Sequence, residues 1–210
     1  MRESPFTRPI ASKYALIIQL GNLKFEPVTE CLDLVADPVA DALRSNPELA
    51  QAIGVAEIDP GVSDTASFCE RYQVGAEFAA NCVIVEGRRG EERHLAACVI
   101  LATTRADVNG VVRKTLDYKR ASFAPMEKAV LESKMEPGAI TPIGLPASWP
   151  ILVDSAVATT EYAIIGSGVR KSKLALPGAI FAKLPGVQVI EGLGRTPTPT
   201  NEVRVNGNTA

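Results

Sequence analysis

Residues 137–144 read Pro137-Gly138-Ala139-Ile140-Thr141-Pro142-Ile143-Gly144, with two prolines and two glycines within eight positions. Proline fixes its own φ angle, and glycine adopts backbone conformations that other residues avoid. The composition therefore predicts a loop whose shape is set by its backbone rather than by side-chain packing. Such a loop can present amide and carbonyl groups to a ligand in a fixed arrangement.

Two further joints follow this loop along the chain. Ile151-Leu152-Val153 is an apolar run that predicts a strand, and Asp154 ends it with a carboxylate. Gly166-Ser167-Gly168 follows another apolar run and precedes Arg170 and Lys171, a composition suited to the close approach of a charged ligand. Each joint alone is explained by a turn, a bulge or a strand-ending cap, so only their combination indicates a site.

Together and in this order, the three joints resemble the family of YbaK proteins and prolyl-tRNA deacylases, which are aminoacyl-tRNA editing domains. The pattern of that family is a Gly-x-x-[Ser/Thr]-Pro-x-Gly loop, then an apolar strand ending in aspartate, then a glycine-rich turn after a further strand. The resemblance covers roughly residues 64–193. It implies an α/β (α+β) fold in which helices flank a curved, barrel-like mixed β-sheet.

The resemblance also implies a function, because proteins of this family hydrolyse the ester bond of wrongly charged tRNA. Relatives act on prolyl-tRNA that carries alanine or cysteine. An aminoacyl ester is already activated, so a rigid polar pocket that holds it beside a water could accelerate hydrolysis without a protein nucleophile. We therefore expect a trans-editing hydrolase that uses no cofactor or metal and has the acceptor end of tRNA, an aminoacyl-adenosine, as its partner.

The residues carried over from the family fall into two groups. The catalytic group, which would orient the water or the loop, consists of Gly138, Thr141, Pro142, Gly144 and Asp154. The substrate-binding group, which would cradle the aminoacyl-adenosine or meet acceptor-stem phosphates, consists of Asn81, Ile140, Gly166, Ser167, Gly168, Arg170 and Lys119.

One position departs from the family pattern. The family usually has a lysine at the start of the strand after the first core helix, where this chain has Asn81. Asparagine forms hydrogen bonds but carries no charge, so catalysis is weakened, retargeted or lost unless Lys114, Lys119 or Arg170 reaches the site. The alternative is a catalytically silent protein that binds tRNA or a small aminoacyl-like ligand. A third hypothesis is a small-molecule binding domain unrelated to tRNA.

Hydrophobic periodicity predicts the elements around these joints. A charged, glycine-bearing turn at 87–92 predicts a hairpin. Three- and four-residue spacing predicts two short helices, or one broken at Pro47, within 37–53, and further helices at 64–74 (capped by Asp64 or Thr65), 107–116, 125–135 and 177–184. Apolar runs predict strands at 14–20, 55–58, 81–86, 94–103, 151–154, 162–166 and 187–190, with 121–124 extended.

Charge is distributed unevenly along the chain. Residues 26–70 hold ten acidic residues against Arg44 alone, a net charge of −9, so the remainder sums to +7 and the whole chain to −2. We expect an acidic, partly helical extension over 1–63, an editing domain over 64–194 and a disordered tail over 195–210. The basic part suits a phosphate-bearing ligand, and the acidic extension suits a protein partner or a homo-oligomer. Solvated helix faces explain both patterns equally well.

The composition also argues against several classes of protein. Its apolar runs are too short to cross a bilayer and its start is polar, so we expect a cytoplasmic protein with no membrane partner. The signatures G-x-x-x-x-G-K-[ST], G-x-S-x-G and H-E-x-x-H are absent. The single histidine, His94, is expected at the surface. The four cysteines form no C-x-x-C pair, which argues against zinc or disulfides, and Cys82 and Cys98 are expected to be buried apolar residues.

Overall fold

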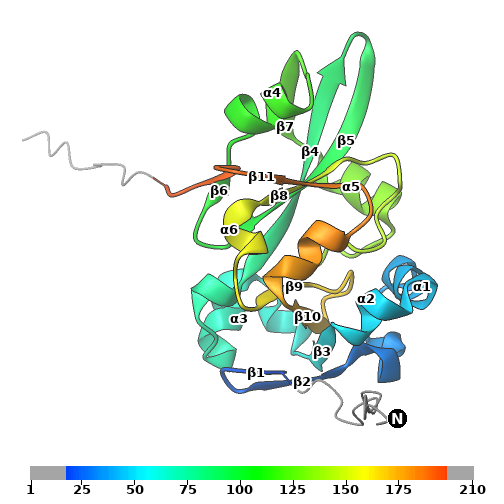
Figure 1. Ribbon diagram of the computed structural model, residues 1–210, viewed down its shortest axis with the longest axis vertical. Coiled ribbons are helices and arrows are strands. Elements are labelled where there is room, and N and C mark those ends of the chain that lie inside the picture. The colour runs from blue at the N-terminus through cyan, green and yellow to red at the C-terminus, as the bar shows by residue number, and fades with distance from the viewer. Residues whose placement is uncertain (1–17, 198–210) are drawn as a thin grey trace, which may run out of the picture.

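The computed structural model describes residues 18–197, which fold around two five-stranded sheets (Figure 1). The first sheet has the strand order β1-β2-β3-β10-β9 and is antiparallel throughout. Strands from distant parts of the chain therefore lie side by side, with β3 paired to β10. The strands are β1 Ile18–Leu20, β2 Leu23–Pro27, β3 Gly54–Glu57, β10 Ser172–Leu176 and β9 Ala163–Gly166.

The second sheet has the order β11-β8-β5-β4-β7 and is mixed. Strand β8 pairs in parallel with both β11 and β5, whereas β4 pairs antiparallel with β5 and β7. The β4–β5 hairpin is long and projects beyond the rest of the molecule (Figure 1). The strands are β11 Val187–Ile190, β8 Ile151–Asp154, β5 Glu92–Leu101, β4 Ala80–Arg89 and β7 Arg120–Phe123.

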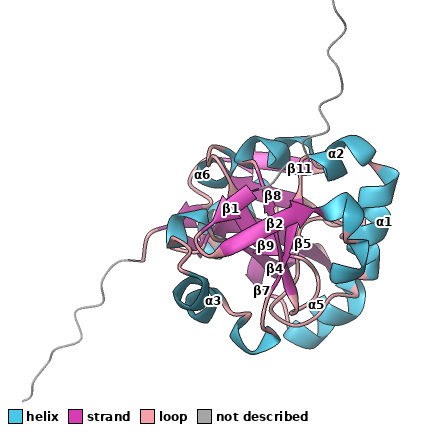
Figure 2. Ribbon diagram, turned by 90° about the horizontal axis from the view of Figure 1, so that it is seen from below, coloured by secondary structure: helices cyan, strands magenta, loops and turns pink. Residues whose placement is uncertain are grey.

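The two sheets meet where β4 begins. Ala79, just before β4, forms a parallel bridge with Ile164 of β9 and so joins one sheet to the other. Seen from below, the strands gather in the centre of the molecule and the helices surround them (Figure 2). The expected fold, a curved mixed sheet flanked by helices, is confirmed.

Short helices cover the sheets. Their ends follow the capping residues in the sequence: Asn46 accepts the amide of Leu49 at 3.1 Å at the start of the second helix, and Asp64 accepts the amide of Ser67 at 3.0 Å. None of the helices within residues 18–197 is both long and apolar enough to span a membrane. The helices are α1 Asp37–Ser45, α2 Pro47–Gln51, α3 Thr65–Tyr72, α4 Arg113–Thr115, α5 Met126–Ser133 and α6 Ser155–Ala158.

Several expected elements differ from those in the structure. The hairpin strands run through the charged segment, so its turn is only Gly90 and Glu91 rather than all of 87–92. The helix expected at 107–116 is a π-helical turn, Val108–Val112, followed by α4, and the one expected at 177–184 is a 3-10 helix, Gly178–Lys183. Strands β2 and β10 were not predicted.

The first predicted strand and the predicted C-terminal tail lie partly outside the described residues. Of the strand expected at 14–20, residues 18–20 form β1 and 14–17 lie outside the described part. Arg195, assigned to the tail from the sequence, lies in β12 Gly194–Arg195, which pairs with β6 Arg105–Ala106. Residues 198–210 lie outside the described range.

The acidic N-terminal segment contributes to the main hydrophobic core. Val39 and Leu43 of α1 are buried in the same cluster as Leu174 and Leu176 of β10. Strand β3, from the same segment, lies in the middle of the first sheet. Burial of these side chains ties residues 18–63 to the remainder of the described chain.

We predict that Gly144→Ala destabilises the protein by roughly 2 to 3 kcal/mol, because the new methyl group would meet backbone and the φ angle is left-handed. A Cβ at Gly144, whose φ is +81°, would lie 2.3 Å from the carbonyl oxygen of Pro38 in α1. The matched control is Gly192→Ala, where φ is +69° but no atom lies within 4 Å of the new Cβ. Urea unfolding should give a loss of only about 1 kcal/mol for the control; equal losses would contradict the prediction.

Candidate functional site

Of the three joints, the two that are rich in glycine, 137–144 and 166–168, lie against each other. The amide of Gly168 donates to the carbonyl of Ala139 at 2.8 Å, and the amide of Glu136 donates to the carbonyl of Gly168 at 2.8 Å. At Gly166 a Cβ would lie 2.3 Å from the carbonyl oxygen of Ala139, so only glycine permits this approach of β9 to the loop. Backbone groups therefore hold the 137–144 loop against the first sheet.

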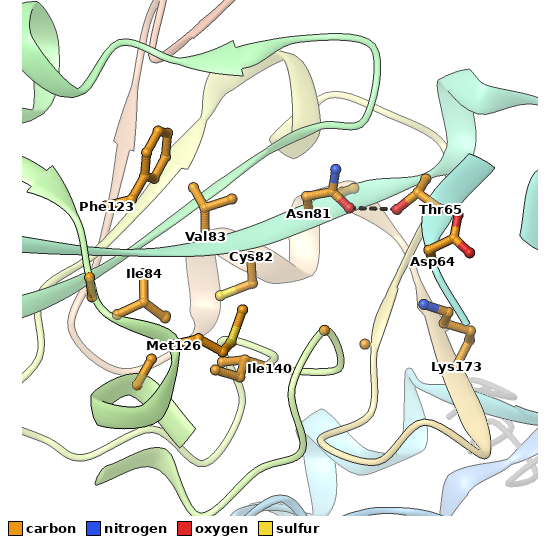
Figure 3. Close-up of a pocket in the computed structure, with 15 residues that line it drawn as sticks. Asp64, Thr65, Asn81, Cys82, Val83, Ile84, Phe123, Met126, Ile140 and Lys173 are labelled. Atoms are coloured by element: carbon orange, nitrogen blue, oxygen red, sulfur yellow. Dashed lines mark hydrogen bonds between the residues drawn. The ribbon is translucent and has the colours of Figure 1, made fainter. Parts of the chain in front are cut away.

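A cavity of about 440 Å³ opens beside this contact, between β4, β10, the start of α3, and α5 (Figure 3). This volume lies in the usual range for a small-molecule site. The cavity has a polar end and an apolar end. Its lining residues are Asp64, Thr65, Ala80, Asn81, Cys82, Val83, Ile84, Phe123, Ala124, Met126, Ala129, Gly138, Ile140, Gly166 and Lys173.

The polar end of the cavity combines side chains from three elements. Thr65, the first residue of α3, donates its hydroxyl to Asn81 Oδ1 of β4 at 2.8 Å. Asp64 caps the same helix, and its hydrogen bond from Ser67 lowers the pKa of its carboxyl. Lys173 extends from β10 toward these residues (Figure 3). This end can therefore donate hydrogen bonds and also presents one carboxylate.

Lys173 is the charged residue of the cavity that the sequence analysis missed. It is only 8% exposed, its Nζ donates to the carbonyl of Ser63 at 2.8 Å, and its ammonium lies 5.4 Å from the ring centre of Phe68. Burial lowers the pKa of Lys173 to about 8, with smaller opposing effects from Cys69 and Asp64. A lysine directly before the apolar run Leu174-Ala175-Leu176 was the available signal, since buried lysines concentrate at functional sites.

The apolar end of the cavity reaches the protein surface. Ile84, Ile140 and Met126 form its wall (Figure 3). Phe123, near the end of β7, is 61% exposed, and Met126 is 55% exposed. An exposed phenyl ring at the mouth of a cavity offers a flat apolar surface for a planar ligand group.

Four of the residues expected from the sequence line this cavity: Asn81, Gly138, Ile140 and Gly166. In the loop, Thr141 follows Ile140 and is fully buried. Its amide donates to the sulfur of Met135 at 3.4 Å, and its hydroxyl has no partner among the described residues. Thr141 is not part of the cavity lining. The loop thus turns inward immediately after Ile140.

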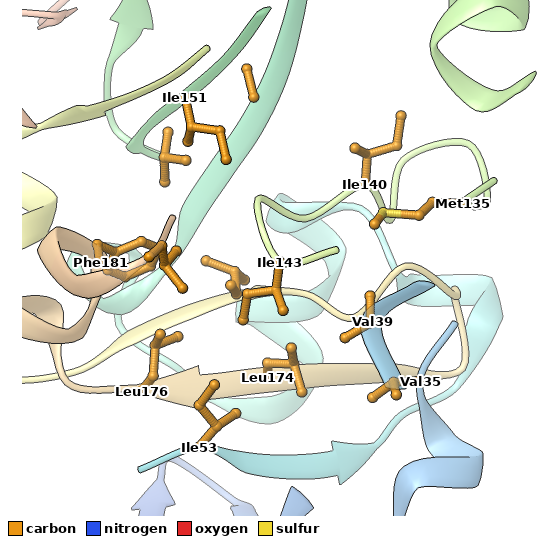
Figure 4. Packing of buried hydrophobic residues seen from close by; sticks show 14 of the residues in the cluster. Val35, Val39, Ile53, Met135, Ile140, Ile143, Ile151, Leu174, Leu176 and Phe181 are labelled. Atoms are coloured by element: carbon orange, nitrogen blue, oxygen red, sulfur yellow. The ribbon is translucent and has the colours of Figure 1, made fainter. Parts of the chain in front are cut away.

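The second half of the loop, residues 142–144, faces away from the 440 Å³ cavity. Pro142 and Gly144 line a separate, mainly apolar cavity of about 220 Å³ beside Trp149. Between them, Ile143 packs into the main core with Val39 and Leu174 (Figure 4). Within the expected loop, only Gly138 and Ile140 line the 440 Å³ cavity.

The remaining expected catalytic residue, Asp154, lies elsewhere. Its carboxylate accepts the amide of Ala156 at 2.7 Å, which caps α6, and the amide of Gly194, the first residue of β12. It is buried and does not line the 440 Å³ cavity. Both carboxylate oxygens thus hold backbone amides in this structure.

The other residues of the third joint are held within the protein. The hydroxyl oxygen of Ser167 lies 3.0 Å from the carbonyl oxygens of both Val169 and Ser172, either of which can accept its single hydrogen. Gly168 lies against α1, where a Cβ would be 2.5 Å from that of Ala36. Neither residue lines the 440 Å³ cavity, so this joint contributes to it through Gly166.

None of the three basic residues expected to compensate for Asn81 lines the cavity. Arg170 donates from its guanidinium to the carbonyl of Pro60 at 2.9 Å. Lys114 and Lys119 are exposed near α4 and β7. The positive charge in the cavity comes from Lys173 instead.

Other reactive side chains give little support for a nucleophile or a metal. Cys82 lines the cavity, but burial raises the pKa of its thiol far above the ordinary value, which disfavours the thiolate. His94 lies near the hairpin turn, stacked on Tyr118 with ring centres 6.4 Å apart, and does not line the cavity. Among residues 18–197, no three His, Cys, Asp or Glu side chains lie close enough to hold a metal ion.

The buried ammonium predicts a pH-dependent stability. Because the pKa of Lys173 is lower in the folded protein than the ordinary value of 10.5, its charged form is disfavoured by folding. The resulting destabilisation is complete below pH 8 and fades as pH rises toward 10.5. We predict that Lys173→Met is more stable than the wild type at pH 7, by roughly 3 kcal/mol at most, and that this advantage shrinks by pH 9.5.

Chemical denaturation at both pH values measures this difference. The control is Lys171→Met, since Lys171 is exposed and lines a different surface. An advantage of Lys173→Met that grew between pH 7 and 9.5 would contradict the assignment of a charge destabilised by burial.

Solved structures similar to this one have little sequence identity with it. A protein described as a candidate trans-editing enzyme for prolyl-tRNA synthetase matches with a TM-score of 0.63 at 14% identity, covering 73% of this chain and 93% of that chain. A hypothetical protein matches with a TM-score of 0.66 at 15% identity, covering 76% and 100%. At such identities the matches establish the fold alone. No curated protein matches the sequence significantly.

The family is established by sequence. Residues 59–184, more than half of the chain, match the family model of the aminoacyl-tRNA editing domain. This match includes the start of α3, both glycine-rich joints and the strands β4, β9 and β10 that form the cavity. The protein therefore belongs to the aminoacyl-tRNA editing domain family.

Proposed function

We propose that this protein is a trans-editing hydrolase that cleaves the ester bond of mischarged aminoacyl-tRNA. The observation that carries the proposal is the 440 Å³ cavity, in which Asn81, Gly138, Ile140 and Gly166 come together from β4, the loop and β9. A cavity of this size accommodates the aminoacyl end of a tRNA while the rest of the molecule stays outside. Membership of the editing family supports the same reaction.

The loop would act through its backbone. Gly138 has a φ angle of +77°, and no atom lies within 4 Å of the position of a Cβ, so the backbone at this point borders open space in the cavity. A water held between such fixed groups and the ester carbonyl needs no protein nucleophile, since positioning lowers the barrier. In this arrangement Thr141, Pro142 and Gly144 support the loop from behind, and Asp154 acts by fixing β8 and α6.

The apolar end of the cavity suits the terminal base of the tRNA. Phe123 can stack on an unpaired base, as aromatic side chains do in single-stranded RNA sites. Lys119 lies just before strand β7, and Arg120 is the first residue of that strand. Both side chains are exposed there and can meet the phosphates of the acceptor end. With the base at this end, the ester lies near Gly138 and the amino acid near the polar end.

A second candidate function is binding without hydrolysis. It is favoured by Asn81, which stands where the family usually has a lysine and whose amide oxygen is already occupied by Thr65. Such a protein would bind aminoacyl-tRNA, or a small aminoacyl-like ligand, and release it unchanged. The acidic segment 26–70 would then be a candidate surface for a protein partner.

We predict that the wild type hydrolyses at least one member of a panel of mischarged tRNAs and that Gly138→Ala reduces this rate by at least ten-fold. The methyl group would enter the cavity and strain the left-handed backbone. Gly192→Ala is the control, because it introduces the same strain in open space away from the cavity. Release of labelled amino acid measures the rate. Salt-dependent binding with no hydrolysis of any substrate would instead establish the second function.

We also predict that Phe123→Ala raises the KM for mischarged tRNA about ten-fold, since loss of one stacked base costs roughly 1 to 3 kcal/mol. The control is Leu131→Ala, because Leu131 is 78% exposed on α5 but does not line the cavity. A second measurement compares binding of an intact RNA hairpin with binding of a hairpin whose terminal nucleotide lacks its base. Wild-type protein should bind it more weakly than the intact hairpin, and Phe123→Ala should bind both equally. Equal loss of affinity in both proteins would contradict stacking on Phe123.

A further inference from the structure

Lys173 lies at the polar end of the cavity, next to the part beside Gly138 where the ester is proposed to bind. In the β9–β10 pair, Lys173 is directly opposite Gly166, so the two residues share one face of the sheet. Gly166 has no side chain, and the peptide of Ala139 and Ile140 occupies the space above it. The lysine side chain is therefore a neighbour of the backbone that forms the wall of the cavity.

The ammonium of Lys173 is held in place but not saturated. An ammonium has three N–H donors, and one of them is used by the carbonyl of Ser63 at 2.8 Å. The ring of Phe68 lies on another side at 5.4 Å. The charged or titratable groups near it are Asp64 and Cys69 of the α3 region and Arg170 of the turn before β10. The cavity itself is the remaining direction in which this cation can act.

We propose that Lys173 stabilises the oxyanion that forms when water attacks the ester carbonyl, so that β10 supplies the positive charge that Asn81 does not supply from β4. This inference rests on the proposed hydrolase function. The proposal concerns Lys173 alone among the basic residues. Lys114 and Lys119 are exposed, the guanidinium of Arg170 is bound to the carbonyl of Pro60, and none of the three lines the cavity.

The step requires no proton transfer from Lys173. The oxygen of water bonds to the carbonyl carbon, and the C=O π electrons move onto the carbonyl oxygen, which becomes the oxyanion facing the ammonium. When the C=O bond re-forms, the bond to the ribose oxygen breaks and that oxygen takes up the proton lost by the water. One water is consumed, and the products are the free amino acid and the tRNA with a free terminal hydroxyl.

The first test is the catalysed rate of Lys173→Met on the best mischarged tRNA. We expect kcat to fall roughly 100-fold with little change in KM, as for loss of a donor that acts in the transition state. Lys171→Met, a change in the exposed lysine two positions earlier, should leave both parameters unchanged. An unchanged kcat in Lys173→Met would overturn the proposal and leave the hydrolase function standing.

The pH profile separates a charged role from a structural one. With a pKa of about 8, Lys173 loses its charge within the accessible range. After subtraction of the uncatalysed rate, the wild-type rate should bend downward above about pH 8, and the residual rate of Lys173→Met should show no such bend. The same bend in both proteins would mean that another group titrates and would overturn the assignment.

A binding measurement makes the test independent of turnover. The probes are two analogues of 3′-alanyl-adenosine, one with a phosphonate and one with an amide in place of the ester. The anionic phosphonate resembles the oxyanion, whereas the amide resembles the ground state. Lys173→Met should bind the phosphonate about 100-fold more weakly than the wild type does and the amide less than three-fold more weakly. Equal effects on both analogues, or no phosphonate binding by the wild type, would overturn the proposal even if no tRNA is hydrolysed.

Discussion

The geometry of the candidate site depends on the close contact between Gly166 and the peptide of Ala139 and Ile140. A Cβ at position 166 would lie 2.3 Å from one carbonyl oxygen and 3.1 Å from the other, so the strand and the loop can meet only through glycine. The hydrogen bonds of Gly168 fix the same loop from the other side of the turn. Because these contacts are between backbone groups, the loop keeps its position independently of side-chain rotamers.

This contact makes the loop a wall between two cavities. Gly138 and Ile140 border the 440 Å³ cavity, whereas Pro142 and Gly144 border the 220 Å³ cavity beside Trp149. The close approach of Gly144 to Pro38 couples the loop to α1, which belongs to the acidic N-terminal segment. The sequence motif therefore combines residues that face a ligand site with residues that attach the loop to the core.

The elements predicted correctly from the sequence are those that depend on residues close together in the chain. The cap Asp64, the break at Pro47 and the periodicity of α1 and α5 each depend on residues within one or two turns. Strand β10 was not predicted because the polar residues Ser172 and Lys173 precede its short apolar run. Strand β2 was not predicted because its alternation of apolar residues with Lys24 and Glu26, although typical of a strand, is short and ends at Pro27. Strand β10 pairs with the distant β3, and β2 pairs with β3 as well as with its neighbour β1, so pairing between strands adds to local propensity in both cases.

The candidate site was only partly predictable for a similar reason. Asn81, Gly138, Ile140 and Gly166 belong to motifs that can be found in one sequence, and all four line the cavity. Lys173 and Phe123 reach it from β10 and β7, and their proximity to the loop depends on strand pairing. Asp154 is a residue that its sequence pattern placed in the site but that does not line the cavity. A carboxylate at the end of a strand has the same pattern whether it faces a ligand or caps a helix, and Asp154 caps α6.

The neutral residue at 81 and the cation at 173 form an electrostatically consistent pair. Both line one cavity, and two ammonium groups confined there would repel each other and lower the pKa of each. The pKa of Lys173 is already lowered to about 8 by burial, so a second cation nearby would favour its neutral form at physiological pH. Asparagine at 81 avoids that repulsion and still presents an amide, so a neutral residue at this position is compatible with a charged cavity.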